Sequence, residues 1–142
     1  MSESLKRRLE KVTELLERLA EKSASGTPVV VEGRNDTDAL TKLAIKGDFI
    51  TAKTSGRSFL DVLREVRDRD TKEVILLMDF DRRGKEWTRR LTQSLEKMRV
   101  KTNTLFWNEL LNLIGRDLKD IEGLPTYMET LRKKCGDQSS KV

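Results

Sequence analysis

The chain has 142 residues, of which 37% are charged and 36% hydrophobic, and a formal net charge of +5. This length suits one domain with a single core, no apolar run approaches the roughly 18 residues of a membrane span, and the positive charge favours a polyanionic partner, nucleic acid first. No histidine and a single cysteine exclude Ser–His–Asp and Cys–His catalysis, histidine-ligated zinc and an internal disulfide framework. Catalysis would therefore depend on carboxylates, lysines, arginines or a metal.

The first expected element is an amphipathic helix within residues 1–26. Its apolar residues recur at four-three-four-three spacing, with charges between them: Leu5, Leu9, Val12, Leu16 and Leu19. We expect this helix to pack on the core of its own domain, although such a stripe can also form a homodimer. The segment lacks the apolar stretch of a secretory signal, so a cytoplasmic setting is the default expectation.

Strand and helix patterns then alternate along the chain. Apolar and β-branched runs predict strands at residues 28–33, 49–53, 73–80 and 99–106. Amphipathic runs predict the intervening helices at residues 35–47, 58–69 and 84–98. This alternation predicts an α/β fold with a compact, parallel, Rossmann-like sheet of about four strands and helices on both faces.

The remainder of the chain is expected to be helical. "WNELLNLIGRDLKDIEGLPTYMETLRKK" predicts two short helices separated by Gly123 and Pro125, followed by a frayed tail. We therefore divide the chain into the N-terminal helix, a core at residues 27–107 and a helical extension at residues 108–142. Nothing in the charged connection from Gly115 to Gly123 indicates a chemical role.

Two of the expected strands end in acidic residues. Glu32 ends the first, with Asp36 just beyond it, and Asp79 and Asp81 end the third. Ligands of an open parallel sheet bind beyond the carboxyl ends of its strands, so these acids should meet if the two strands are neighbours. Residues two apart in a strand point the same way, so Asp79 and Asp81 should converge while Phe80 packs on the other side. Crowded carboxylates repel one another, and Mg²⁺, a hard cation with oxygen ligands, suits the arrangement.

Simpler interpretations of these acids exist. A single carboxylate at a strand end is usually a helix N-cap or a solvated charge. An aspartate pair after an apolar strand also occurs in phosphatases that form an aspartyl phosphate, with the first aspartate as nucleophile. That alternative leaves Glu32 unexplained.

The acidic segments resemble the Toprim domain, the metal-binding catalytic module of bacterial-type primases, topoisomerases and certain nucleases. "VVVEGRNDTDAL" and "LLMDFDRRGKEWTRRL" match the family's glutamate after the first strand and its DxD after the third, with a glycine behind it. The first motif is most similar to the bacterial ribonuclease that matures 5S ribosomal RNA. The chain also resembles the small stand-alone Toprim proteins of archaea that are often labelled primase-like.

The resemblance implies roles for the acids. Glu32 would be the acid/base or metal-contacting residue, and Asp79 and Asp81 would complete the catalytic set and hold Mg²⁺, with Mn²⁺ as the other candidate. Asp36 would be an additional metal-binding acid of the nuclease-type first motif.

Basic residues gather in segments expected to open at the same edge of the sheet. We expect them to hold the phosphate backbone of a nucleic acid: Arg34, Lys53, Arg57, Arg82, Arg83, Lys85 and Arg89. Trp87 and Trp107 lie on apolar stripes and are expected in the core, and an aromatic content of 5% gives no support to recognition by base stacking.

The sequence thus favours a magnesium-dependent nuclease or phosphotransfer enzyme acting on phosphodiester bonds of RNA or DNA. Primer synthesis and strand passage are not expected, because 142 residues leave no room for further primase subdomains and the one tyrosine, Tyr127, lies in an apolar helical stretch. The alternative is a non-catalytic nucleic-acid-binding subunit of a larger RNA- or DNA-handling complex. No membrane partner is expected.

Overall fold

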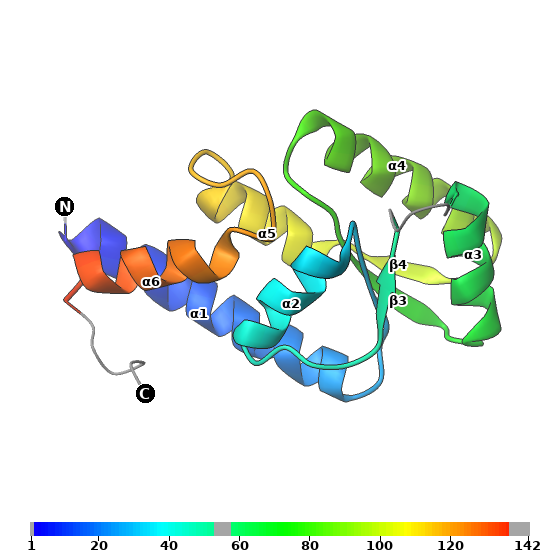
Figure 1. Cartoon of the computed structure of the whole chain (residues 1–142), viewed down its shortest axis with the longest axis horizontal. Coiled ribbons are helices and arrows are strands. Elements are labelled where there is room, and N and C mark those ends of the chain that lie inside the picture. Colours follow the sequence, from blue (N-terminus) through cyan, green and yellow to red (C-terminus); the bar gives the residue numbers. More distant parts are fainter. Residues whose placement is uncertain (1, 53–57, 137–142) are drawn as a thin grey trace.

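The computed structural model describes residues 2–52 and 58–136 (Figure 1). These residues form helices and strands in the following order: α1 (Ser2–Ala24), β1 (Val29–Val31), α2 (Arg34–Lys42), β2 (Phe49–Thr51), α3 (Phe59–Asp68), β3 (Glu73–Leu77), α4 (Arg82–Lys97), β4 (Lys101–Asn103), α5 (Leu105–Ile114) and α6 (Leu124–Lys134). None of these helices is both long and apolar enough to cross a membrane.

The four strands form one parallel sheet in the order β2–β1–β3–β4. Val30 of β1 pairs with Ile50 of β2 on one side and with Leu76 of β3 on the other. The expected α/β fold with a four-stranded parallel sheet is therefore confirmed. The two strands that precede the acidic motifs, β1 and β3, are neighbours in the middle of the sheet.

Helices cover both faces of the sheet, as expected. Val31 and Ile75 point into a core shared with α1, α2, α5 and α6, whereas Val30 and Leu76 point into a second core under α3 and α4. Figure 1 shows α3 and α4 on one side of the sheet and α1, α5 and α6 on the other. This double burial explains why β1 and residues Val74 to Leu77 of β3 are all apolar.

The apolar stripe of α1 is buried inside the chain. Leu9, Val12, Leu16 and Leu19 are at most 7% exposed, and α1 packs against α5 and α6. The stripe thus has partners within its own chain. The homodimer through α1 stays a prediction. The division of the chain into an N-terminal helix, a core and an extension also stays a prediction.

Several element boundaries differ from those expected. β3 ends at Leu77 rather than Phe80, and α4 begins at Arg82 because Asp81 caps its N-terminus. The fourth strand is short because the side chain of Asn103 accepts a hydrogen bond from the main-chain N–H of Leu105 at 3.0 Å, where α5 begins. The DxD motif therefore lies in the connection between β3 and α4, and its side chains need not alternate as they would in a strand.

Candidate functional site

Glu32 joins the two central strands just beyond their carboxyl ends. It directly follows β1, is only 8% exposed, and its Oε2 accepts a hydrogen bond from the main-chain N–H of Asp79 at 3.0 Å. A buried carboxylate needs such a partner to offset the loss of solvation. This contact brings the two motifs of the sequence together, as their strand positions predicted.

Asp36 lies beside this bridge, in the first turn of α2. Its Oδ2 accepts the main-chain N–H of Gly33 at 3.0 Å, which closes the turn between β1 and the helix. Asp36 is 6% exposed, and burial raises its pKa; the hydrogen bond from Gly33 opposes that rise, while repulsion from Glu32 adds to it. Asp36 thus shapes the turn and contributes charge to the site.

Asp79 is the carboxylate most perturbed by its neighbours. Its pKa is raised from 3.8 to about 7, chiefly by burial and also by the negative charges of Glu32, Asp36 and Asp81. The hydrogen bond that its Oδ1 accepts from the main-chain N–H of Ile121 at 3.1 Å opposes this rise. Burial and repulsion by neighbouring carboxylates both favour the protonated form of an acid, so the raised pKa reflects the enclosed position of Asp79 as well as the charges around it.

Asp81 has a different position from Asp79. It is exposed, and its Oδ1 accepts the main-chain N–H of Gly84 at 2.7 Å as the N-cap of α4. Asp81 is absent from the residues that line the pocket around Asp79. The expected convergence of the two aspartates is therefore only partial, because β3 has ended before either of them; Phe80 between them is buried, as expected.

Gly84 allows the backbone of Asp79 to lie very close to the start of α4. A Cβ atom added to Gly84 would overlap the carbonyl oxygen of Asp79 and lie 2.7 Å from its carbonyl carbon. Only glycine permits this approach, which explains the glycine that follows the aspartates in the motif.

The acids surround a pocket of about 440 Å³ at the carboxyl edge of the sheet. Its lining combines the ends of β1 and β3 with the connection between α5 and α6: Glu32, Gly33, Arg34, Asn35, Asp36, Asp79, Asp120 and Glu122. Five of these side chains are carboxylates and one is basic, so an anionic substrate would meet strong repulsion unless a cation were bound.

Asp120 and Glu122 were not found from the sequence. The connection that carries them crosses the end of β3, where the main-chain N–H of Phe80 donates to the carbonyl of Lys119 at 2.8 Å and Ile121 donates to Asp79. Their only sequence signal was a pair of acids in "KDIEG", which resembles an ordinary helix-capping connection. Asp120 also has that role, since its Oδ1 accepts the N–H of Gly123 at 2.7 Å.

The acidic pocket suits a hard divalent cation in its donor chemistry. It offers carboxylate oxygens, the ligands Mg²⁺ prefers, and a cation would relieve the repulsion that raises the pKa of Asp79. As placed, Glu32, Asp36 and Asp79 each accept a main-chain N–H, and no three acidic or cysteine side chains of residues 2–52 and 58–136 form a ready-made metal cluster.

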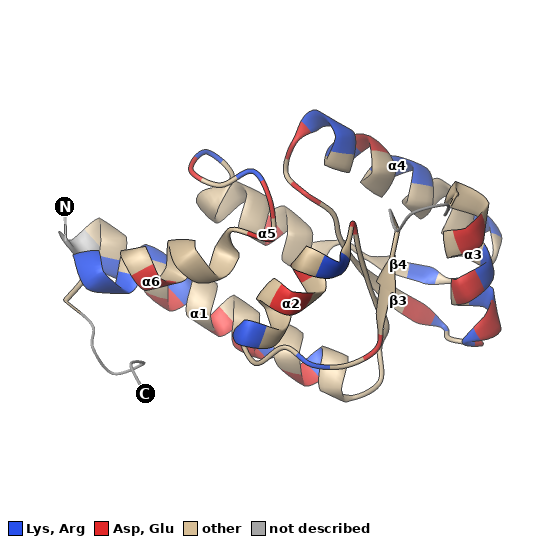
Figure 2. Ribbon diagram, in the orientation of Figure 1, with Lys and Arg blue, Asp and Glu red and all other residues tan. Residues whose placement is uncertain are grey.

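The expected phosphate-binding residues divide into three groups. Arg34 is exposed in the lining of the acidic pocket, and Arg82, Arg83 and Lys85 are exposed in the first turn of α4. Figure 2 shows the ribbon in the colour of basic residues where α4 begins. Arg89 is exposed but paired with Glu86, its Nη2 lying 2.5 Å from Oε1. Lys53 and Arg57 lie outside the described residues. The beginnings of α2 and α4 share the edge of the sheet where the acids gather, because each helix directly follows a central strand.

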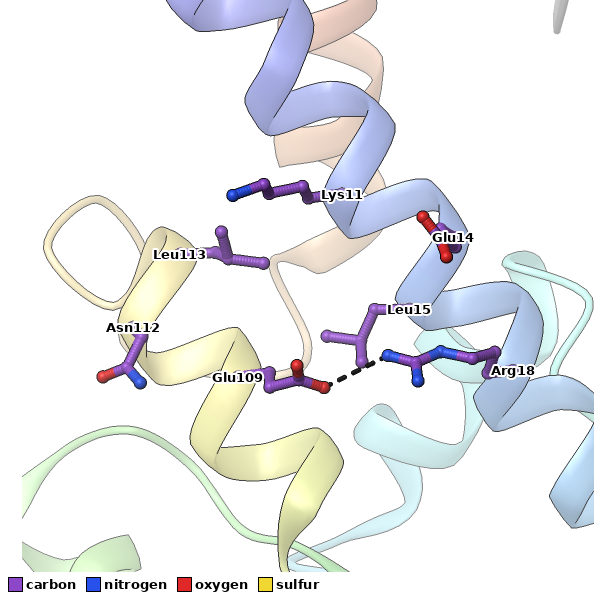
Figure 3. Close-up of a pocket in the computed structure, with 7 residues that line it drawn as sticks. All are labelled: Lys11, Glu14, Leu15, Arg18, Glu109, Asn112 and Leu113. Atoms are coloured by element: carbon purple, nitrogen blue, oxygen red, sulfur yellow. Dashed lines mark hydrogen bonds and ion pairs between the residues drawn. The ribbon is translucent and has the colours of Figure 1, made fainter.

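Another hollow, between α1 and α5, has a different character (Figure 3). Its volume is about 390 Å³, and Leu15 and Leu113 lie in its lining beside an ion pair between Arg18 and Glu109 at 3.2 Å. It contains no group of neighbouring carboxylates and no thiol or hydroxyl nucleophile. The acidic pocket is therefore the better candidate for chemistry.

The fold and the position of the acids define a Toprim protein. Residues 26–105, more than half of the chain, match the family model of the Toprim domain, and the chain belongs to this family. Toprim domains generally bind Mg²⁺ through acidic residues and typically act on nucleic acids. A nucleic-acid-related, metal-dependent role follows from membership.

The particular relatives are small proteins of similar length. A UPF0292 protein of Methanosarcina barkeri is 34% identical over 134 residues, which cover 94% of this chain and 92% of that one. A UPF0292 protein of Methanocaldococcus jannaschii is 38% identical over 120 residues, covering 84% of this chain and 91% of the relative. A solved structure of a protein from Aquifex aeolicus matches with a TM-score of 0.64 and 28% identity, over 77% of this chain and 94% of the other.

Proposed function

We propose that this protein is a magnesium-dependent enzyme that cleaves or transfers phosphodiester bonds of RNA or DNA. The observation that carries the proposal is the shared pocket of Glu32, Asp36 and Asp79 at the ends of two neighbouring parallel strands. Within it, burial and then the neighbouring negative charges raise the pKa of Asp79 to about 7. Neighbouring carboxylates with strongly shifted pKa values are typical of functional sites.

In this proposal Glu32, Asp36, Asp79 and Asp81 hold the divalent cation, Mg²⁺ or Mn²⁺. A bound Mg²⁺ supplies Lewis-acid polarisation of the phosphodiester and stabilises charge on the leaving oxygen. Glu32 takes up or delivers a proton from a fixed position, because its contact with the N–H of Asp79 and its burial restrict the side chain. Arg34, in the pocket lining, orients a phosphate oxygen beside the acids.

The decisive experiment is a cleavage assay on end-labelled structured RNA and DNA. Wild-type protein should cut in Mg²⁺ or Mn²⁺ and not in EDTA, and Asp79→Asn and Glu32→Gln should reduce the rate at least about a hundredfold. Asp38→Asn is the matched control, since Asp38 is exposed and lies outside the pocket lining. Equal rates for wild type and both site variants would show that the catalytic proposal is wrong.

The second candidate is a non-catalytic nucleic-acid-binding subunit of a larger processing complex. The observation that favours it is that Glu32, Asp36 and Asp79 already have main-chain partners, so each acid also stabilises the fold. This candidate predicts salt-sensitive binding that survives Asp79→Asn, together with no cleavage under any metal condition.

A further inference from the structure

A surface away from the acidic pocket combines stacking planes with an excess of positive charge. We propose that the seam between α3 and α4, formed by Phe59 and Leu60 of α3 with Arg83, Trp87 and Arg90 of α4, binds an unpaired stretch of nucleic acid. We name this surface the α3–α4 platform. The inference rests on the proposed nucleic-acid function and narrows its substrate to one with a single-stranded segment.

The centre of the platform is a cluster of three side chains, those of Phe59, Trp87 and Arg90. The ring centroids of Phe59 and Trp87 lie 5.6 Å apart at 56°, and Cζ of Arg90 lies 4.3 Å from the centroid of Phe59. Phe59 and Trp87 are only partly buried, at the border of the second core. Arg90 is exposed, and its guanidinium lies over the ring of Phe59. Guanidinium and aromatic planes are the surfaces on which unpaired bases stack.

Leu60 adds exposed apolar surface to the first turn of α3. It is 59% exposed, and Leu105 is the other large apolar side chain among the described residues that is exposed to a comparable degree. Leu60 neighbours Phe59 in the first turn of α3. An exposed leucine alone needs no explanation, and adjacent residues of a helix do not face each other, so Leu60 adds apolar surface to the start of α3 rather than to the cluster of Phe59, Trp87 and Arg90.

The charge of the platform complements a phosphate backbone. Residues 82–90 contain five basic residues and one acid, Glu86, which pairs with Arg89. Arg90 and Arg82 also help to lower the pKa of Glu86, but within residues 2–52 and 58–136 Glu86 forms its ion pair with Arg89. The platform therefore keeps an excess of positive charge from Arg82, Arg83, Lys85 and Arg90. Basic residues in the first turn of a helix oppose its dipole, so helix stability does not account for them.

The platform has the arrangement that single strands need. Arg83, Trp87 and Arg90 are spaced by four and three residues, which puts them on one face of α4. A single strand can place its bases on the aromatic cluster and its phosphates on the arginines at the same time, whereas a duplex hides its base faces and offers only phosphates. The helix α4 begins at the carboxyl edge of the sheet, so a strand held here continues toward the acidic pocket.

Tryptophan fluorescence tests the platform directly, because the chain has two tryptophans in different environments. Trp107 is 7% exposed and its Nε1 donates to the carbonyl of Met78 at 2.9 Å, whereas Trp87 belongs to the platform. In EDTA, a single-stranded RNA or DNA oligonucleotide should quench wild type and Trp107→Phe. Trp87→Phe should lose the response. The duplex of the same sequence should bind at least about tenfold more weakly.

Anisotropy with the same oligonucleotides provides a measurement that is independent of fluorescence. Arg90→Gln should weaken single-strand binding about tenfold and leave duplex binding unchanged. Arg67→Gln is the matched control in the last turn of α3, where Arg67 is exposed and contacts Asp68, and it should bind like wild type. Equal affinity for single strand and duplex, quenching that persists in Trp87→Phe, or equal behaviour of the two arginine variants would each overturn the platform.

These outcomes are separable from the proposed catalytic function. Metal-dependent cleavage without quenching at Trp87 would refute the binding role of the platform and support the proposed catalytic function. Single-strand binding at Trp87 without cleavage would support the platform and refute the enzyme.

Discussion

Oε2 of Glu32 accepts a hydrogen bond from the main-chain N–H of Asp79 at 3.0 Å, so the acid that ends β1 is bonded to the first acid after β3. The two residues lie far apart in the sequence and meet because β1 and β3 are paired in parallel register, Val31 opposite Leu77. This one contact links the stability of the fold to the geometry of the acidic pocket.

Replacement of Glu32 should separate these two contributions. Glu32→Ala leaves the N–H of Asp79 without its acceptor in a buried position, and we expect a loss of about 1–3 kcal/mol in the free energy of unfolding. Glu32→Gln keeps an oxygen acceptor and should lose less than about 1 kcal/mol while abolishing metal-dependent activity. Urea unfolding of both variants measures the difference, and equal stability would contradict the structural role of the hydrogen bond.

The pKa of Asp79 predicts how stability changes with pH in the absence of metal. The folded protein raises the pKa of Asp79 from 3.8 to about 7, so folding favours the protonated carboxyl. The protonated Asp79 therefore contributes its full share to the free energy of unfolding below about pH 4, and this share is lost as the pH rises through 7. Between pH 5 and pH 8 in EDTA, we expect the free energy of unfolding to fall by about 1–2 kcal/mol, after allowance for solvent screening of this half-buried group.

Asp79→Asn should remove that pH dependence, since its amide oxygen can still accept the N–H of Ile121. Asp38→Asn should keep the wild-type profile, because Asp38 is exposed. Mg²⁺ should stabilise wild type more at pH 8 than at pH 5, as binding requires ionised carboxylates. An identical pH profile for wild type and Asp79→Asn would refute the assignment.

Gly84 should tolerate no side chain. In Gly84→Ala the new methyl group would overlap the carbonyl of Asp79, so either α4 or the DxD segment must move, at a cost of about 1–3 kcal/mol. We also expect loss of metal-dependent activity, because the movement displaces Asp79. Gly33→Ala is the control for stability: no atom lies within 4 Å of a Cβ there, and thermal unfolding should be nearly unchanged.

The basic first turn of α4 should set the salt dependence of nucleic-acid binding. Each phosphate contact to a single strand contributes a slope of about 0.7 in a plot of log affinity against log salt concentration. The combined Arg82→Gln, Arg83→Gln and Lys85→Gln variant should therefore reduce the slope by about 2. A slope unchanged from wild type would exclude these side chains as phosphate contacts.

Part of the site followed from local patterns. The acids after β1 and β3 and the glycine behind the DxD motif were recognised because strand ends and helix starts have strong local signatures. The different positions of Asp79 and Asp81 did not follow, because they depend on where β3 ends, which pairing with β1 and β4 decides. Trp87 was expected in the core, and it packs against the second core while staying partly buried, because its environment depends on how α3 packs on α4.

The sequence by itself determined the parallel α/β sheet and the Toprim motifs, because β-branched runs, helical periodicity and helix caps act over a few residues and are visible in the chain. Only the tertiary structure decided that Asp120 and Glu122 join the pocket of Glu32 and Asp79 and that Phe59 meets Arg90. The physical reason is the same in both cases. The packing of α5 and α6 on α1, and of α3 on α4, sets where these connections and side chains lie, and no local period encodes contacts between distant elements.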